Sequence, residues 1–197
     1  MIGDYQNAVL FFQKSIDDDP GSFRPRRGLA LSLLQKCSAL ESEGTVTAEE
    51  WKSAARAVHY ALRIYDDTSL RSQQAVAEVN AAKCFEARGD TISAVHCALQ
   101  AVALQPRDVR AIDYAAVLSY RTGNNKAARD LFLQATVVDS SDAVAFFNIG
   151  MLNWYSRDKL RAYDWWLKAL KRSPFDTVIV YWVARAESDL KRMAGRK

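Results

Sequence analysis

A period of 34 residues runs through the second half of this chain. Turn-forming residues recur 34 residues apart at Pro106, Ser140 and Pro174. Small residues keep the same step in three columns, which are Ala94, Ala128 and Ala162; Ala101, Ala135 and Ala169; and Ala82, Ala116 and Gly150. A period of this length corresponds to one supersecondary unit per copy. The sequence therefore predicts a row of similar units, each of which needs its neighbour to bury its apolar face.

Each unit is predicted to be a pair of helices joined by a tight turn. Large apolar residues fall between the small ones at helical spacing, so each helix has one apolar face. Gly89 and Gly123 are expected to end the first helix in the left-handed conformation, and Asp90 or Asn124 then begins the second helix. In the last copy Arg157 stands where the other copies have this glycine.

These features resemble a known repeat family. The segment GDTISAVHCALQAVALQPRD, residues 89–108, resembles the second helix and closing turn of a tetratricopeptide repeat, and AVAEVNAAKCFEAR before it resembles the first helix. The resemblance implies an all-α fold, a superhelix of about ten antiparallel-paired helices in one domain over residues 1–197. Its expected parts are a half repeat at 3–20, a repeat with an inserted loop at 23–68, repeats at 75–108, 109–142 and 143–176, and a capping helix at 177–193.

The N-terminal part departs from the period. Residues Ser38 to Thr47 show no apolar spacing and are predicted to form a loop, with the preceding helix running up to a turn or two into it. Thr47 and Glu50 form a capping-box pattern that starts the next helix. Residues 3–20 match only the second half of a repeat. Two interpretations stay open: the sequence is a piece of a longer protein, which we favour, or this helix covers its apolar side with something else, such as a partner chain.

The composition is that of a globular chain, with 49% hydrophobic and 25% charged residues. There is no run of about 18 apolar residues and no leader pattern, so we expect a cytoplasmic or other intracellular protein without membrane insertion. Cys37, Cys84 and Cys97 form no CxxC pair. They are interpreted as buried small residues and not as disulfide partners or zinc ligands.

Residues that could carry chemistry are few. His59 and His96 lie on predicted helices, and neither has a cysteine or histidine at metal-ligand spacing. The acidic run 17–19 lacks the alternating carboxylates and central glycine of a calcium loop, and no glycine-rich phosphate loop is present. We therefore predict no catalytic residue, no metal site and no cofactor.

The resemblance also implies a peptide-binding surface. In tetratricopeptide-repeat proteins the first helix of each repeat lines a concave groove, and asparagines at its sixth position bond the main chain of an extended peptide. In this sequence that column holds Asn80, Tyr114, Asn148 and Trp182. The remaining predicted groove residues are Lys83, Arg110, Tyr155, Tyr181 and Arg185, with Val117, Phe147 and Met151 beside them. For the aromatic members, packing between repeats is the alternative interpretation.

Three functions stay open. The first is a non-catalytic adaptor or scaffold that binds a peptide segment of a partner protein in the groove. The second is a structural subunit that joins a larger complex or oligomer through the N-terminal half repeat. A carboxylate clamp like that of heat-shock co-chaperones would use Asn80 and Arg110, and could use Arg27, but Leu31 and Tyr114 occupy two of its polar columns.

Charge distribution supplies the third function. Residues 157–197 contain eleven Lys or Arg against five Asp or Glu, within a chain of net charge +4. Such a basic end could attract an acidic protein partner or bind single-stranded RNA. RNA binding is the less favoured of these, because the base-reading columns of RNA-binding helical repeats are polar and the corresponding columns here are apolar or aromatic.

Overall fold

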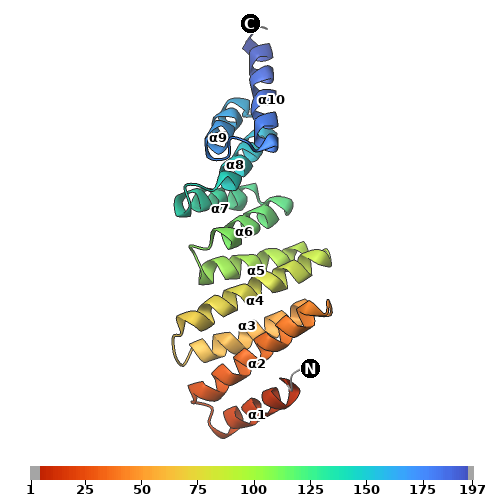
Figure 1. Cartoon of the computed structure of the whole chain (residues 1–197), viewed down its shortest axis with the longest axis vertical. Helices are drawn as coiled ribbons and strands as arrows, with labels where there is room; N and C mark the ends of the chain where they lie inside the picture. The colour runs from red at the N-terminus through yellow and green to blue at the C-terminus, as the bar shows by residue number, and fades with distance from the viewer. Residues whose placement is uncertain (1–4, 195–197) are drawn as a thin grey trace. The chain divides into compact units, whose positions relative to one another are not determined.

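The computed structural model describes residues 5–194, and within that range the chain forms ten α-helices and no β-strand (Figure 1). The predicted all-α fold is thereby confirmed. Residues 3 and 4 of the predicted half repeat lie outside the described residues. In chain order the helices are α1 (Tyr5–Asp18), α2 (Phe23–Ser42), α3 (Ala48–Leu62), α4 (Thr68–Ala87), α5 (Thr91–Leu104), α6 (Val109–Arg121), α7 (Asn125–Val138), α8 (Ala143–Tyr155), α9 (Lys159–Arg172) and α10 (Thr177–Ala194).

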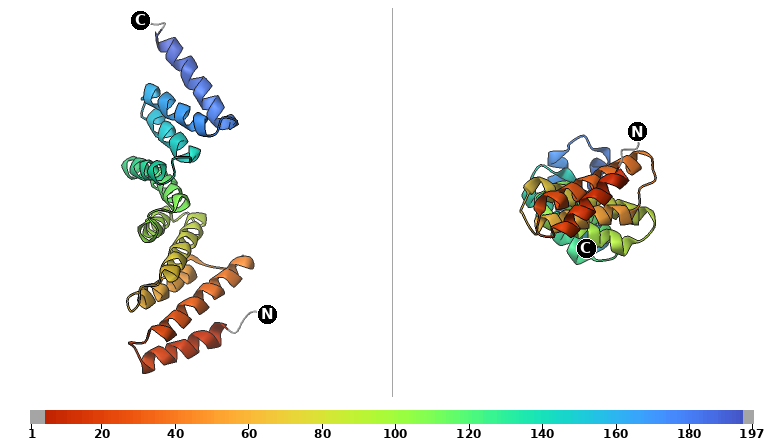
Figure 2. Two further views of the ribbon diagram at one scale, coloured as in Figure 1. Left: turned by 60° about the vertical axis from the view of Figure 1, so that its left-hand side comes forward. Right: turned by 90° about the horizontal axis from the view of Figure 1, so that it is seen from below.

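The contacts group the chain into two units, Met1–Pro106 and Arg107–Lys197. We call them the N-terminal unit, with helices α1 to α5, and the C-terminal unit, with helices α6 to α10. The single domain expected from the sequence stays a prediction. Inside each unit every helix packs against the helix that follows it in the chain. Figures 1 and 2 show these neighbours side by side. Each unit is thus a stack of helical hairpins.

The helix ends follow from turn chemistry. Gly89 and Gly123 both have a φ of 80°, as predicted for left-handed stops, and Arg157 takes the same conformation with a φ of 65°. A left-handed residue with a side chain is strained, so arginine is less favourable than glycine at this turn. Short polar side chains accept hydrogen bonds from the first free backbone N–H groups of the helices. These caps are Asp67, Asp90, Asp108, Asn124, Asp142, Asp158 and Asp176.

Helices α2 and α4 are each 20 residues long, whereas the corresponding first helices α6 and α8 have 13 residues. Helix α2 continues to Ser42, so half of the predicted loop is helical. Buried Cys37 and half-buried Leu40 explain the extension, because they continue the apolar face by another turn. The capping box is confirmed: the N–H of Glu50 donates to Thr47 Oγ1, and the N–H of Thr47 donates to Glu50 Oε2.

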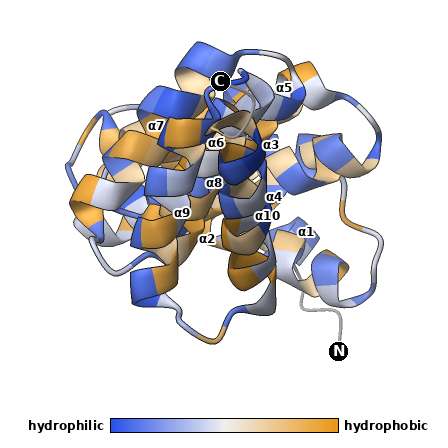
Figure 3. Ribbon diagram, turned by 90° about the horizontal axis from the view of Figure 1, so that it is seen from above, coloured by the Kyte–Doolittle hydropathy of each residue, from blue (hydrophilic) through white to orange (hydrophobic). Residues whose placement is uncertain are grey.

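Small residues let paired helices approach closely. The alanines of all three repeating columns are buried. At Gly150 even a methyl group has no room, because a Cβ there would lie 2.3 Å from Nε1 of Trp166. The indole N–H of Trp166 donates to the carbonyl oxygen of Phe147 at 3.1 Å, which fixes the ring against α8. Figure 3 shows apolar and polar residues alternating along α7 and α9, as expected for helices that bury one face.

Candidate functional site

A cleft of about 790 Å³ lies in the N-terminal unit. Helices α2 and α4, the first helices of two successive repeats, supply most of its lining, and Tyr5 of α1 and Trp51 of α3 complete it. The α4 residues Gln73, Val76 and Asn80 are three and four positions apart, so they share one face of that helix. Its size falls within the range of ligand-binding clefts in proteins.

The cleft depends on the two long helices. If α2 had only 13 residues, as α6 does, it would end near Gln35. Ser38 and Glu41 lie on the extra turns of α2 beyond that point, and both line the cleft. Gln73 lies in the part of α4 that precedes the repeat predicted from Ala75. Sequence reasoning missed these residues because it assigned them to an insertion. The signal that could have found them is the apolar face continuing through Cys37 and Leu40.

Two buried polar atoms of the cleft residues have no hydrogen-bond partner among residues 5–194. They are Nε1 of Trp51 and Oε1 of Gln73. Trp51 is only 2% exposed, yet its indole N–H is unpaired, unlike that of Trp166. A buried donor or acceptor left unpaired costs about 1–3 kcal/mol of stability. Two residues that line the cleft thus carry one buried donor and one buried acceptor without internal partners.

The cleft is acidic in character. Glu41 is the one charged side chain among the described residues that line it. The nearby cations are paired elsewhere: Lys36 lies 3.2 Å from Glu50, and Lys52 donates to Glu78 and to Gln100. Arg27, considered above for a carboxylate clamp, pairs instead with Asp67 at 3.6 Å, and Leu31 contributes apolar surface to the cleft.

The predicted groove residues have different surroundings in the structure. Asn80 lines the cleft, while Lys83, three residues further along α4, is exposed and is not among the lining residues. In the C-terminal unit Tyr114 and Asn148 are half-buried. Arg110 is almost fully exposed, with its guanidinium 3.9 Å from Asp108.

The other predicted groove residues lie on α8 and α10. Tyr155 and Tyr181 are exposed, and Arg185 donates a hydrogen bond to the hydroxyl of Tyr181 at 3.3 Å. Trp182 is half-buried and belongs to an aromatic cluster, with ring centroids 5.7 Å from Trp154 and 5.2 Å from Trp166. Packing between helices is therefore one role of Trp182. Its part in ligand binding stays a prediction.

Aromatic rings fill the space between α8, α9 and α10. Trp166 is fully buried at the centre of this aromatic cluster, stacked on Phe147 and tilted against Trp154. The ammonium group of Lys159 lies 4.8 Å above the ring of Trp154, an arrangement in which a cation is attracted to the ring face. The large rings leave this part of the C-terminal unit closely packed.

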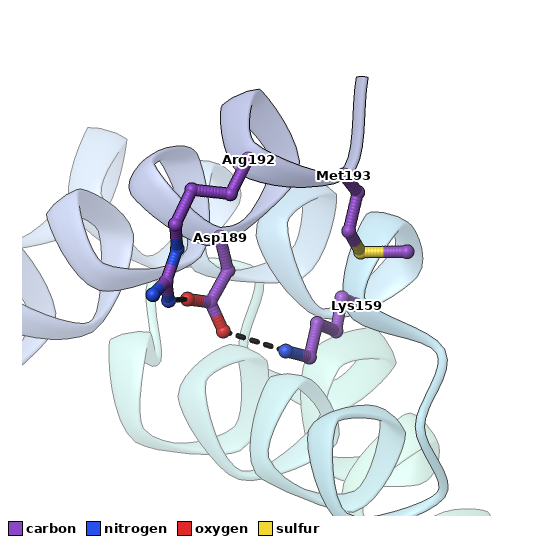
Figure 4. Close-up of a pocket in the computed structure, with 4 residues that line it drawn as sticks. All are labelled: Lys159, Asp189, Arg192 and Met193. Carbon is purple, nitrogen blue, oxygen red and sulfur yellow. Dashed lines mark hydrogen bonds and ion pairs between the residues drawn. The ribbon is translucent and has the colours of Figure 1, made fainter. Parts of the chain in front are cut away.

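A smaller pocket of about 210 Å³ lies at the end of α10 (Figure 4). Asp189 is buried there and accepts hydrogen bonds from Lys159 at 2.6 Å and from Arg192. Hydrogen bonds from Lys159 and Arg192 lower the pKa of the Asp189 carboxyl below its usual value. Since both cations are paired with this carboxylate, the pocket is an ion-paired joint between α9 and α10.

Two carboxyl groups meet between α6 and the start of α8. Asp142 caps α8 by accepting from the N–H of Val144 at 2.9 Å. Oδ1 of Asp113 and Oδ2 of Asp142 are buried, and while both carboxyl groups are ionised neither oxygen accepts a hydrogen bond from a described residue. Burial, a hydrogen bond that protonated Asp113 can donate to Asp142, and charge repulsion from Asp142 together raise the pKa of Asp113 to about 7. The pair is therefore most stable when it holds one proton.

Residues typical of catalysis are dispersed. His59 and His96 are both exposed on helices. Cys37 and Cys97 are buried and Cys84 is half-buried, and burial raises the pKa of the Cys37 and Cys97 thiols to about 11. In the described range no group of three or more potential metal ligands is found, and no helix has the length and apolarity to cross a bilayer. The absence of catalytic, metal and cofactor sites stays a prediction.

Known proteins with a similar fold bind peptides in some cases. The sequence matches no known family profile, and a search of curated proteins finds no match. Among solved structures, the chain is similar to MamA, with a TM-score of 0.57 and 17% identity over 87% of this chain and 90% of that chain. It is similar to YrrB, described as a TPR protein with an unusual peptide-binding site, with a TM-score of 0.51 and 19% identity over 91% of this chain and 84% of that chain. The first TPR of Spaghetti (RPAP3) bound to the HSP90 peptide SRMEEVD is also similar, with a TM-score of 0.56 and 15% identity over 61% of this chain and 95% of that chain.

Proposed function

We propose that this chain, which has the fold of the tetratricopeptide-repeat proteins, is a non-catalytic adaptor that binds a peptide segment of a partner protein on the face formed by the first helices of its repeats. The observation that carries the proposal is the cleft between α2 and α4, which holds apolar surface, amide groups and unpaired polar atoms together. Helical hairpins that pack along their whole length change little on binding, so mainly the ligand loses conformational freedom.

Asn80 was predicted from the sequence as a groove residue, and it also lines the cleft in the structure. A side-chain amide both donates and accepts, so it can bond a peptide main chain whatever the side chains of that peptide are. The descriptions of two similar proteins support the proposal, since YrrB is described with a peptide-binding site and RPAP3 was solved with a peptide. In the C-terminal unit, we propose the groove residues Arg110, Tyr114, Asn148, Tyr155, Tyr181, Trp182 and Arg185 as a further contact surface. Lys83 remains the proposed contact beside Asn80.

Selection of peptides from a random phage-displayed library on the purified chain tests this function. Asn80→Ala should weaken a selected peptide by about fivefold to tenfold, because it removes a hydrogen-bonding group that faces the cleft. The midpoint of thermal unfolding should stay nearly the same, since Asn80 is only half-buried. Asn148→Ala provides the same test for the C-terminal unit. Failure to select any peptide would contradict the adaptor function.

A second candidate function is that of a structural subunit. The observation that favours it is the apolar surface of α1, where Leu10 is 67% and Phe11 is 66% exposed while the next residue, Phe12, packs at Gly28 of α2. Sedimentation velocity separates the two functions. A stable monodisperse monomer would count against an obligate subunit, and a dimer or an insoluble chain would count against a free adaptor.

We further propose a cytoplasmic or other intracellular location, and an acidic partner for the basic C-terminal end.

A further inference from the structure

We infer that the cleft between α2 and α4 binds a short, extended, apolar peptide segment that is neutral or positively charged and whose main chain bonds Trp51 and Gln73. This inference rests on the proposed peptide-binding function and names the class of ligand. Three properties of the cleft carry it: its apolar surface, its unpaired donor and acceptor, and its charge.

The apolar surface comes from both long helices. Leu31 and Leu34 on α2 lie one turn apart, so they point from the same face of that helix. Val76 lines the cleft from α4 and is 56% exposed. Covering such groups with an apolar side chain removes them from water and stabilises the complex in proportion to the area covered. The ligand is therefore expected to place at least one apolar side chain here.

The unpaired atoms identify the main chain as the second feature recognised. The indole of Trp51 can only donate a hydrogen bond, and Oε1 of Gln73 can only accept one. Every non-proline residue of a peptide offers one C=O acceptor and one N–H donor, so an extended segment satisfies both atoms with its backbone. Asn80, further along the same face of α4, adds an amide with both capacities. Both atoms are buried, so the side chains of Trp51 and Gln73 must turn toward the cleft for these bonds to form.

Charge decides which peptides are accepted. Lys36 and Lys52 are paired with Glu50 and Glu78, and the exposed Lys83 is not among the residues that line the cleft. Glu41 is exposed, lines the cleft and forms no ion pair with a described residue. A negative side chain on the ligand would be repelled by this carboxylate, whereas a lysine or arginine would be attracted. The cleft should therefore reject acidic peptides, in contrast to what the basic C-terminal end of the chain suggests on its own.

Selection from a random phage-displayed peptide library, with the intact chain as bait, tests the inference. The selected peptides should be apolar with neutral or positive net charge, and synthetic fluorescent copies should bind in an anisotropy titration. Glu41→Lys should weaken the binding of positively charged copies by about tenfold. Glu43→Lys is the matched control, because Glu43 carries the same charge two residues later, is exposed and is absent from the cleft. It should change affinity by less than about twofold.

A second variant tests the hydrogen bond. Trp51→Phe keeps an aromatic ring and removes the N–H, so it should weaken the same peptides by about fivefold. Circular dichroism confirms that both variants keep the fold. If the selected peptides are acidic, or if they bind Glu41→Lys and Trp51→Phe as tightly as the natural chain, the inference is overturned while peptide binding elsewhere on the chain stands. If no peptide is selected at all, the proposed function itself is contradicted.

Discussion

The two units of this chain differ in the face formed by their first helices. In the N-terminal unit α2 and α4 are long, their facing residues are aliphatic or amide-bearing, and a cleft remains between them. In the C-terminal unit the residue at the column of Asn80 is Trp182 in the last helix, and it packs against Trp154 and Trp166. One repeat pattern thus leaves a cleft between α2 and α4 and places a ring from α10 in an aromatic cluster with α8 and α9.

The difference shows that side-chain volume and helix length decide which residues of a repeat protein stabilise the fold and which remain available for binding. The same indole group occurs in both settings: the N–H of Trp166 bonds the carbonyl of Phe147, whereas the N–H of Trp51 has no partner among the described residues. A satisfied, close-packed indole contributes to stability, and an unsatisfied one beside a cleft is suited to a ligand. We therefore expect substitutions in the aromatic cluster of the C-terminal unit to affect mainly folding, and those at the cleft to affect mainly binding.

The largest effect should come from Trp166→Ala. Trp166 is fully buried between Gly150 and the rings of Trp154 and Trp182, and its removal leaves a cavity that these neighbours cannot fill. Urea unfolding followed by circular dichroism should show a loss of about 3–5 kcal/mol. Leu160→Ala, at an exposed position of the same helix, is the control. A loss below about 1 kcal/mol for Trp166→Ala would show that the aromatic cluster does not hold the unit together.

Gly150→Ala tests the close approach of α8 and α9 with a single methyl group. Because the added Cβ would lie 2.3 Å from Nε1 of Trp166, the ring must shift, and its bond to Phe147 is strained. We expect a loss of about 1–3 kcal/mol in the same unfolding experiment, although alanine favours helices more than glycine does. Gly21→Ala is the control, since a Cβ there meets its nearest neighbour at 3.6 Å. A stabilised Gly150→Ala protein would contradict the packing described for the C-terminal unit.

The free energy of unfolding should depend on pH through Asp113 in the C-terminal unit. The raised pKa of Asp113, about 7, means that the folded chain holds a proton that the unfolded chain releases near its ordinary value of 3.8. This contribution to stability is complete below the unfolded pKa and is lost as the pH rises through about 7. The full shift corresponds to about 4 kcal/mol. Because Asp113 is only half-buried, solvent screening reduces the effect, and the free energy of unfolding of the natural chain, relative to that of Asp113→Asn, should fall by about 1–2 kcal/mol between these limits. Parallel pH profiles for the two proteins would remove Asp113 as the cause.

The smallest expected effect is a difference in the free energy of unfolding between substitutions at the two buried tryptophans, Trp51 and Trp166. Trp51→Phe and Trp166→Phe delete the same atoms from sites that are almost fully buried, but only the second deletes a formed hydrogen bond. Trp166→Phe should therefore cost about 1 kcal/mol more in urea unfolding. Equal losses would indicate that Trp51 has a stabilising bond in solution, and the contrast between the two units would lose its basis.

Sequence periodicity predicted much of the architecture for a physical reason. Helical spacing, turn glycines and caps are local signals, so Gly89, Gly123 and the Thr47–Glu50 capping box could be assigned from residue order alone. The extension of α2 was underestimated because the segment after Ser38 is polar, and its helical state depends on contacts of Cys37 and Leu40 with other helices. The grouping into two units depends on the distribution of contacts, which a repeat count does not contain.

The candidate site was only partly predictable. Asn80 could be named by its column, but the same column rule names Trp182, which lies in an aromatic cluster. The importance of Trp51 and Gln73 comes from two atoms that lack partners, a property of tertiary packing. No spacing rule reveals which buried indole has an acceptor nearby.

The most direct test of the account is a two-dimensional ¹H–¹⁵N NMR titration of the chain with a peptide selected from the phage library. The five tryptophans give five indole N–H signals that report on both units separately. We expect the Trp51 signal to shift on saturation, because its N–H gains an acceptor, while the Trp166 signal stays in place. A Trp51 signal that does not move when the peptide is bound would contradict it.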